Sequence, residues 1–159
     1  MKALIGMLVV GVLAYFVWQR GSGAGTEVID DPVYGEIRID LEVQGRELEM
    51  ALFARLPDDG ECQTRATQDW QGVFEACPAC NLHPVQCRDE LPPRYARLFD
   101  DEPISSWYVS MQPGMAGERQ GRLVVYGLTD QEGAVVCKEL LKAVKQKYRG
   151  TARCVAPAG

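Results

Sequence analysis

Six cysteines constrain the fold of this chain more than any other feature of its sequence. All of them lie between residues 62 and 154, beyond an apolar N-terminal segment, and their number is even. In an oxidising compartment an even set of cysteines predicts disulfide bonds. The chain has 159 residues, enough for one domain with a hydrophobic core. We therefore expect one domain stapled by three disulfides, made by Cys62, Cys77, Cys80, Cys87, Cys137 and Cys154.

The first 20 residues are typical of a membrane segment. From Ala3 to Trp18 no residue is charged, Lys2 precedes this run, and Arg20 follows it. A helix of this length spans about 24 Å, slightly less than a hydrocarbon core of about 30 Å. Residues 1–20 are therefore expected to form an N-terminal transmembrane helix that acts as a signal-anchor.

A secretory signal sequence cleaved after Ala24 is the alternative, because small residues stand at suitable spacing there. Residues 21–32 are rich in glycine and then acidic, which is typical of a flexible tether. Both interpretations place residues 33–156 outside the cytoplasm. The chain is then a single-pass inner-membrane protein with its C-terminal domain in the periplasm. After cleavage it would instead be secreted or periplasmic.

The stretch from Glu36 to Leu56 predicts a β-hairpin. Apolar and charged residues alternate along its first half, and Gln44-Gly45 suits a two-residue turn. This turn fixes a register in which apolar residues oppose one another on one face: Leu41 with Leu48, Ile39 with Met50, and Ile37 with Leu52. The alternative for the second half is a helix, because its residues are strong helix formers.

Two longer helices are predicted in the rest of the chain. Cys62–Cys77 has apolar residues spaced three and four apart. The second helix begins after Thr129, which forms a capping box with Glu132, and Gly150 closes it as the C′ residue. A shorter helix is expected over Pro92–Phe99.

Further strands are predicted at Ser105–Met111, Arg122–Leu128 and Thr151–Val155. Together these elements indicate an α+β domain with helices on one face of the sheet. We expect a mostly antiparallel sheet of about four to five strands, with one long C-terminal helix and a second helix. Disulfides staple this domain behind the N-terminal transmembrane helix.

The cysteine pairing is only partly determined by spacing. Cys137 and Cys154 are expected to pair, because a strand returning along the helix brings them together. A regular helix from Cys62 to Cys77 would hold these two about 22 Å apart, too far for a bridge. Two connectivities remain: Cys62–Cys80 with Cys77–Cys87, or Cys62–Cys87 with Cys77–Cys80.

The motif CPAC, Cys77 to Cys80, suggests three specific functions besides a structural disulfide: thiol redox catalysis, zinc binding and haem attachment. A thioredoxin-like oxidoreductase needs this motif at the start of a helix, whereas here it follows a helical stretch. Zinc could be held by Cys77, Cys80, His83 and Cys87, but an oxidising compartment competes for the thiolates. Haem attachment needs a histidine where Asn81 stands. We expect a structural clamp, with no metal and no cofactor.

The outward face of the predicted hairpin is acidic. Its register sets Glu42 opposite Glu47 and Asp40 opposite Glu49, and Glu36 extends the patch. Like charges directly opposite one another are unfavourable in a sheet. One explanation is a docking face for a basic partner protein, and the other is a solvated face whose repulsion is tolerated. These five acids are the candidate partner-binding residues.

The composition and motifs favour a binding protein over an enzyme. The net charge of −5 argues against nucleic-acid binding, which needs a basic surface. The sequence has no serine nucleophile elbow and no phosphate-binding glycine loop, so no catalytic residue is proposed. We expect a non-enzymatic, membrane-anchored protein-binding domain of the cell envelope: an accessory subunit of an envelope complex, an assembly factor or a toxin-immunity protein.

Two alternatives belong to other classes of protein. A peptidoglycan- or glycan-binding envelope protein would use exposed aromatic residues, among Trp70, Trp107 and Tyr108, which are otherwise expected in the core. A thiol–disulfide oxidoreductase would use the CPAC motif, with a labile bond between Cys77 and Cys80.

Overall fold

The computed structural model describes residues 28–66 and 80–158. Several sequence predictions lie outside these ranges: the N-terminal anchor or signal, most of the tether, and the helical stretch from residue 67 onward, with Trp70 and Cys77. Within the described ranges, no helix combines the length and the apolar composition that a membrane crossing requires.

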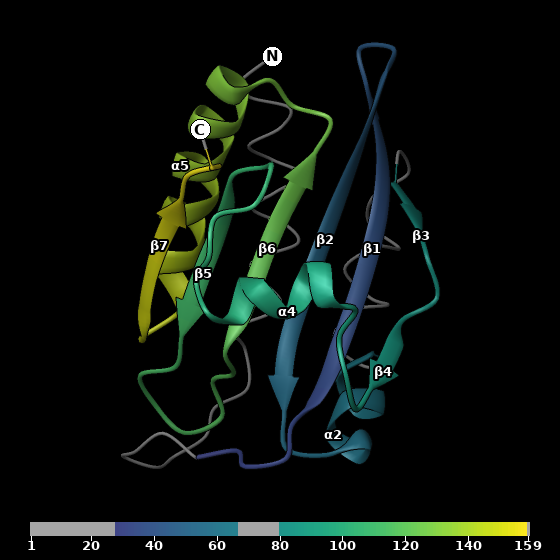
Figure 1. Ribbon diagram of the computed structural model, residues 1–159, viewed down its shortest axis with the longest axis vertical. Helices are drawn as coiled ribbons and strands as arrows, with labels where there is room; N and C mark the ends of the chain where they lie inside the picture. The colour runs from purple at the N-terminus through teal and green to yellow at the C-terminus, as the bar shows by residue number, and fades with distance from the viewer. Residues whose placement is uncertain (1–27, 67–79, 159) are drawn as a thin grey trace.

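An antiparallel sheet of seven strands forms the centre of the described domain (Figure 1). The strands run in the order β3-β1-β2-β6-β5-β7, and β4 pairs with β1 on the same edge as β3. Their bounds are β1 Val33–Val43, β2 Arg46–Leu56, β3 Cys80–Leu82, β4 Gln86–Arg88, β5 Tyr108–Gln112, β6 Gly121–Tyr126 and β7 Thr151–Val155. The sheet exceeds the expected four to five strands because the cysteine-rich loop contributes β3 and β4. Each has three residues, too few for alternation to be recognised.

The β1–β2 hairpin has the predicted register. Its opposing pairs include Leu41 with Leu48, Ile39 with Met50, and Ile37 with Leu52. Gln44 and Gly45 form the turn with φ angles of 55° and 76°, the positive values that a two-residue type I′ turn requires. The helical alternative for the second half is wrong. β2 lies between β1 and β6 and buries apolar side chains on both of its faces, which a strand in a central position can do.

Helices cover both faces of the sheet, and the prediction of helices on one face is wrong. On the first face, α5 (Asp130–Lys147) and the short α2 (Asp59–Thr64) contribute to the larger core, together with Leu52. On the second face, α4 (Pro93–Phe99) crosses in front of the strands in Figure 1 and packs against the fully buried Phe53. Adjacent residues of β2 therefore point into two different cores.

Helix α5 begins as predicted and ends differently. Thr129 accepts a hydrogen bond from the backbone N–H of Glu132, and the Glu132 carboxylate accepts one from the backbone N–H of Thr129, completing the capping box. The C-cap is Tyr148, in an extended conformation, so Gly150 is not the C′ residue. Gly150 is required for a different reason: a Cβ there would lie 1.9 Å from the carbonyl oxygen of Gln112.

The disulfides decide part of the cysteine connectivity that the sequence left undetermined. Cys137–Cys154 is confirmed, with the two Cα atoms 6.0 Å apart. Cys62–Cys87 is present, which excludes the connectivity that joined Cys62 to Cys80 and fastens β4 to α2. Cys80 is also disulfide-bonded.

A fully buried arginine holds α4 on the sheet. Arg122, on β6, donates hydrogen bonds to the backbone carbonyl oxygens of Leu98 and Phe99 at the end of α4, and to that of Met111 on β5. It also forms an ion pair with Asp101 at 3.0 Å. Burial lowers the pKa of Arg122, and the negative charge of Asp101 opposes this shift. The charge is retained because nearly every donor of the guanidinium has a partner.

Candidate functional site

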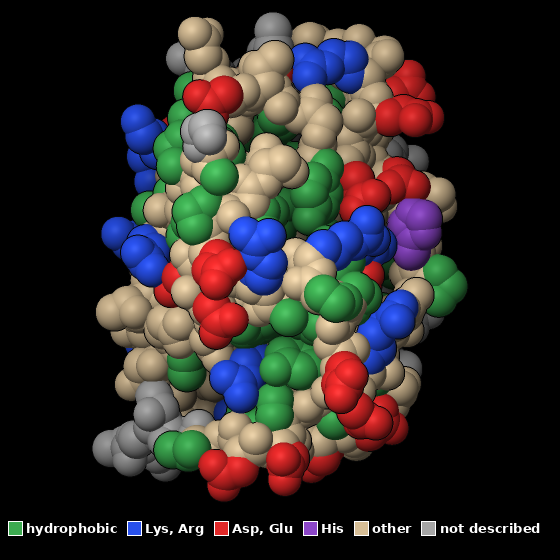
Figure 2. Space-filling model, viewed as in Figure 1, with side chains coloured by type: hydrophobic (Ala, Val, Ile, Leu, Met, Phe, Trp, Pro, Cys, Tyr) green, Lys and Arg blue, Asp and Glu red, His purple; other side chains and the backbone are tan. Residues whose placement is uncertain are grey.

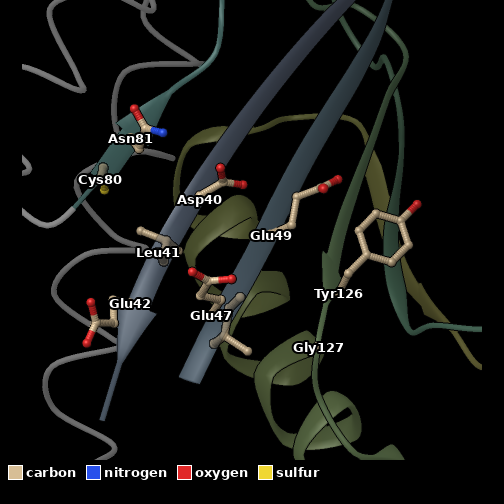
Figure 3. Close-up of a pocket in the computed structure, with 10 residues that line it drawn as sticks. Asp40, Leu41, Glu42, Glu47, Glu49, Cys80, Asn81, Tyr126 and Gly127 are labelled. Carbon is tan, nitrogen blue, oxygen red and sulfur yellow. The ribbon is translucent and has the colours of Figure 1, made fainter. Parts of the chain in front are cut away.

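A cleft of about 900 Å³ opens at the turn end of the β1–β2 hairpin. Figure 3 shows β1 and β2 running through it, with β3 on one side and the end of β6 on the other. Ten residues line the cleft: Asp40, Leu41, Glu42, Glu47, Leu48, Glu49, Cys80, Asn81, Tyr126 and Gly127. Four of the five predicted partner-binding acids therefore lie together, and we call this site the acidic cleft.

Glu42 and Glu47 are the acids of the cleft that are most available to a partner. They are directly opposite one another across β1 and β2, as predicted, and both side chains are exposed. Among the residues that the structure describes, neither side chain has a hydrogen-bond or ion-pair partner. Two uncompensated carboxylates side by side repel each other and attract a cation.

Asp40 already has a partner in the cleft wall. Its Oδ2 lies 2.7 Å from Nε2 of His83, the residue that follows β3. This contact ties the three-residue strand β3 to β1 through side chains as well as through backbone pairing. In Figure 2 the histidine lies next to the acidic side chains that gather beside the hairpin.

Glu49 is bound to Arg38, which lies on the same face of β1 as Asp40. The Arg38 guanidinium donates to Glu49 and to Glu36, and it stacks 5.0 Å from the ring centre of Tyr95 on α4. Burial alone would lower the pKa of Arg38, but its hydrogen bonds to Glu36 and Tyr95 raise the pKa above its ordinary value. Arg38 is therefore a fixed positive charge beside the cleft, already engaged by acids of the protein itself.

Glu36 does not line the cleft and is not accessible to a partner. It is only 4% exposed, and its carboxylate pairs with Arg38 at 2.5 Å and with Arg88 of β4 at 3.5 Å. The sequence placed it with the exposed acids because it shares their face of β1. The structure makes it part of the interior instead.

The turn end of the hairpin is fastened to the start of helix α5. Arg46 donates to the Glu132 carboxylate at 2.8 Å and to the carbonyl oxygen of Gly127 at 2.6 Å. Its hydrogen bond, followed by the bond from the backbone of Thr129, lowers the pKa of Glu132 to about 2. Glu132 stays ionised at neutral pH and holds one rim of the cleft in place.

The walls of the cleft contain residues that sequence reasoning did not single out. Asn81 lies opposite Asp40 in the β1–β3 pairing, and Tyr126 lies opposite Glu49 in the β2–β6 pairing. Burial raises the pKa of Tyr126 to about 12, so its ring stays neutral and offers a π face next to the carboxylates. A cation is attracted both to carboxylates and to aromatic faces. No local signal could have found these walls, since both strand pairings join distant parts of the chain.

Of the residues behind the two alternative functions, the described ones, Cys80, Trp107 and Tyr108, lie in structural positions. Cys80 is disulfide-bonded and begins strand β3, whereas a thioredoxin-like motif needs a helix start there. Tyr108 is 1% exposed, and the indole N–H of Trp107 donates to Asp130 at the start of α5. Cys87 of the suggested zinc set is bonded to Cys62. Across residues 28–66 and 80–158, no group of three or more metal-binding side chains is arranged to hold a metal ion.

The site can therefore attract a cationic group and hold it by charge, by hydrogen bonds and against an aromatic wall. No protein-family model matches this chain, and no curated protein or solved structure is significantly similar to it.

Proposed function

We propose that this chain is a membrane-anchored, extracytoplasmic binding domain whose acidic cleft takes up a basic segment of a partner protein. It supplies a tether and a recognition surface, and no catalytic chemistry. The observation that carries the proposal is the pair Glu42 and Glu47, exposed and directly opposite one another, whose carboxylates have no ion-pair or hydrogen-bond partner among the described residues.

Cross-strand repulsion gives this pair a reason to bind a cation. Like charges in directly opposed positions destabilise a sheet. A guanidinium or ammonium group placed between Glu42 and Glu47 relieves that repulsion, and the gain adds to the affinity for the partner. Asp40 and Glu49 contribute less, because His83 and Arg38 already engage them.

The proposed setting is the periplasmic side of the inner membrane. The uncharged segment from Ala3 to Trp18 is the anchor in this proposal, and residues 21–32 form the tether. An oxidising compartment suits a domain held by Cys62–Cys87 and Cys137–Cys154. A domain tethered there meets its partner at the membrane surface, as an accessory subunit, assembly factor or immunity protein would.

Binding of a defined cationic peptide tests the proposal. The full chain, in zwitterionic detergent micelles at low ionic strength, is titrated into fluorescent hexa-arginine and the anisotropy is followed. We expect Glu42→Gln with Glu47→Gln to weaken binding about ten-fold, because each lost charge contributes roughly a factor of three at close range in water. We also expect added salt to reduce wild-type affinity, since exposed charges are screened.

The matched control removes two charges from elsewhere on the surface. Asp89→Asn with Glu90→Gln changes the net charge equally, and both residues are exposed and lie outside the cleft. Equal weakening in the two double variants would show a response to net charge alone and would contradict the proposal. Substitution of Glu49 is less suitable, because it also releases Arg38.

A further inference from the structure

The only histidine of the chain lies at the edge of the acidic cleft. The backbone N–H of His83 donates to the carbonyl oxygen of Arg38 at 3.0 Å, which fixes the residue beside β1. Its Nε2 lies 2.7 Å from Oδ2 of Asp40, a residue that lines the cleft. Both side chains keep contact with solvent, with exposed fractions of 44% and 43%. Protons can therefore reach the imidazole without any opening of the fold.

The charged groups around this pair come from β1, β2, β4 and α4. The acids are Asp40 and Glu42 on β1 and Glu47 and Glu49 on β2. The bases include Arg38, held by Glu36 and Glu49, and Arg88 of β4, paired with Glu36. Arg94 of α4 stacks on Tyr95 and acts on Tyr126 of the cleft wall. Strand β3 carries no charged residue. Arginine stays charged at all accessible pH, and carboxylic side chains ordinarily ionise below pH 5. Histidine is the side chain whose charge ordinarily changes between pH 5 and 8.

We propose that protonation of His83 regulates the acidic cleft by weakening its hold on basic segments. This inference rests on the proposed function of the cleft. With a neutral imidazole, only arginines supply positive charge near the four carboxylates of the cleft, and of these Arg38 binds Glu49 directly. Protonation places a second cation directly against Asp40, so a basic ligand meets a weaker field. Affinity for the ligand is therefore lower when His83 carries the proton than when it is neutral.

The coupling also acts in the opposite direction. Because linkage between two bound species is reciprocal, a basic ligand in the cleft disfavours the proton on His83. Binding at intermediate pH therefore releases a proton to the buffer. The cleft would accept its partner in a neutral medium and release it in an acidified one.

The size of the effect follows from one unit charge at short range. A charge about 6 Å from a ligand cation changes affinity about three-fold in water, and up to about ten-fold where the cleft wall lowers the effective dielectric constant. The effect is largest at low ionic strength, because exposed charges are screened by salt.

The experiment uses the full chain, purified with a histidine-free tag in zwitterionic detergent micelles, and hexa-arginine as the ligand. The dissociation constant is measured at about pH 8 and about pH 5.5 for wild type, His83→Gln and His83→Lys. Glutamine stays neutral and can hydrogen-bond to Asp40, whereas lysine stays charged at both pH values. We expect wild type to bind about three- to ten-fold more weakly at the lower pH. We expect His83→Gln to bind tightly at both values and His83→Lys to bind weakly at both.

Calorimetry in two buffers of different ionisation enthalpy supplies a second readout. Near neutral pH the binding heat of wild type should depend on the buffer, because a proton is released, and that of His83→Gln should not. If wild type binds hexa-arginine but His83→Gln weakens at low pH as much as wild type does, this inference is overturned and the proposed function stands. If wild type does not bind at either pH, the proposed function fails and this inference falls with it.

Discussion

Replacement of Glu36 by glutamine separates the interior role of this residue from the surface role that its sequence position suggested. The Glu36 side chain is 5% exposed and pairs with Arg38 at 2.5 Å and with Arg88 at 3.5 Å. Breaking a fully buried ion pair costs about 3–5 kcal/mol. Here the loss is smaller, since Arg38 keeps Glu49 and its stack on Tyr95, and glutamine keeps one hydrogen bond. We expect the free energy of unfolding to fall by about 2 kcal/mol.

Urea unfolding of the full chain in detergent micelles, followed by far-ultraviolet circular dichroism, measures this loss. The double variant Glu36→Gln with Arg38→Met should lose less unfolding free energy than the two single variants lose together. The difference, which is the interaction energy of the pair, should be at least about 1 kcal/mol, because the two residues are in direct contact. Hexa-arginine affinity should not change in Glu36→Gln. A variant as stable as wild type that binds the peptide more weakly would refute the reasoning and return Glu36 to the binding surface.

Three further predictions concern the helix α5 side of the domain. Cys137→Ala with Cys154→Ala should lower the free energy of unfolding by about 3 kcal/mol, because the bridge closes a loop of 17 residues. Urea unfolding titrations measure this loss, and a value below about 1 kcal/mol would contradict the loop-entropy argument. Gly150→Ala should reduce the melting temperature sharply, since its Cβ would lie 1.9 Å from a backbone oxygen; an unchanged melting temperature would mean that the backbone relaxes there. Hydrogen bonding lowers the pKa of Glu132 from 4.5 to about 2. The ionised carboxylate therefore stabilises the folded state fully above about pH 5, and this stabilisation is lost as the pH falls toward 2. The melting temperature of Glu132→Gln, which weakens the contact to Arg46, should therefore lie below that of wild type at neutral pH and converge with it near pH 2; a constant difference would refute the linkage.

Features set by neighbouring residues were predictable from the sequence. The alternation before Gln44-Gly45 and the two-residue turn together determine the whole β1–β2 register, and with it the four carboxylates of the cleft. The start of α5 follows from Thr129 and Glu132, three residues apart. In each case the signal lies within a few residues of the structure that it specifies.

Features that depend on distant contacts were not predictable. Alternation distinguishes the two faces of β1 but does not say what covers each face, so the burial of Glu36 under contacts from β4 was missed. Tyr126 reaches the cleft because β6 pairs with β2, and Asn81 reaches it because β3 pairs with β1. Strands of three residues such as β3 form because a longer neighbour holds them, and their own sequence carries no pattern of that length.

Hydrogen exchange of the full chain with and without hexa-arginine tests the acidic cleft most directly, because it locates binding as well as detecting it. Peptides covering residues 40–49 should exchange more slowly when the ligand is present at low ionic strength. This protection should disappear when Glu42 and Glu47 are both replaced by glutamine. Slower exchange confined to other parts of the domain, with residues 40–49 unchanged, would contradict the assignment of the binding site.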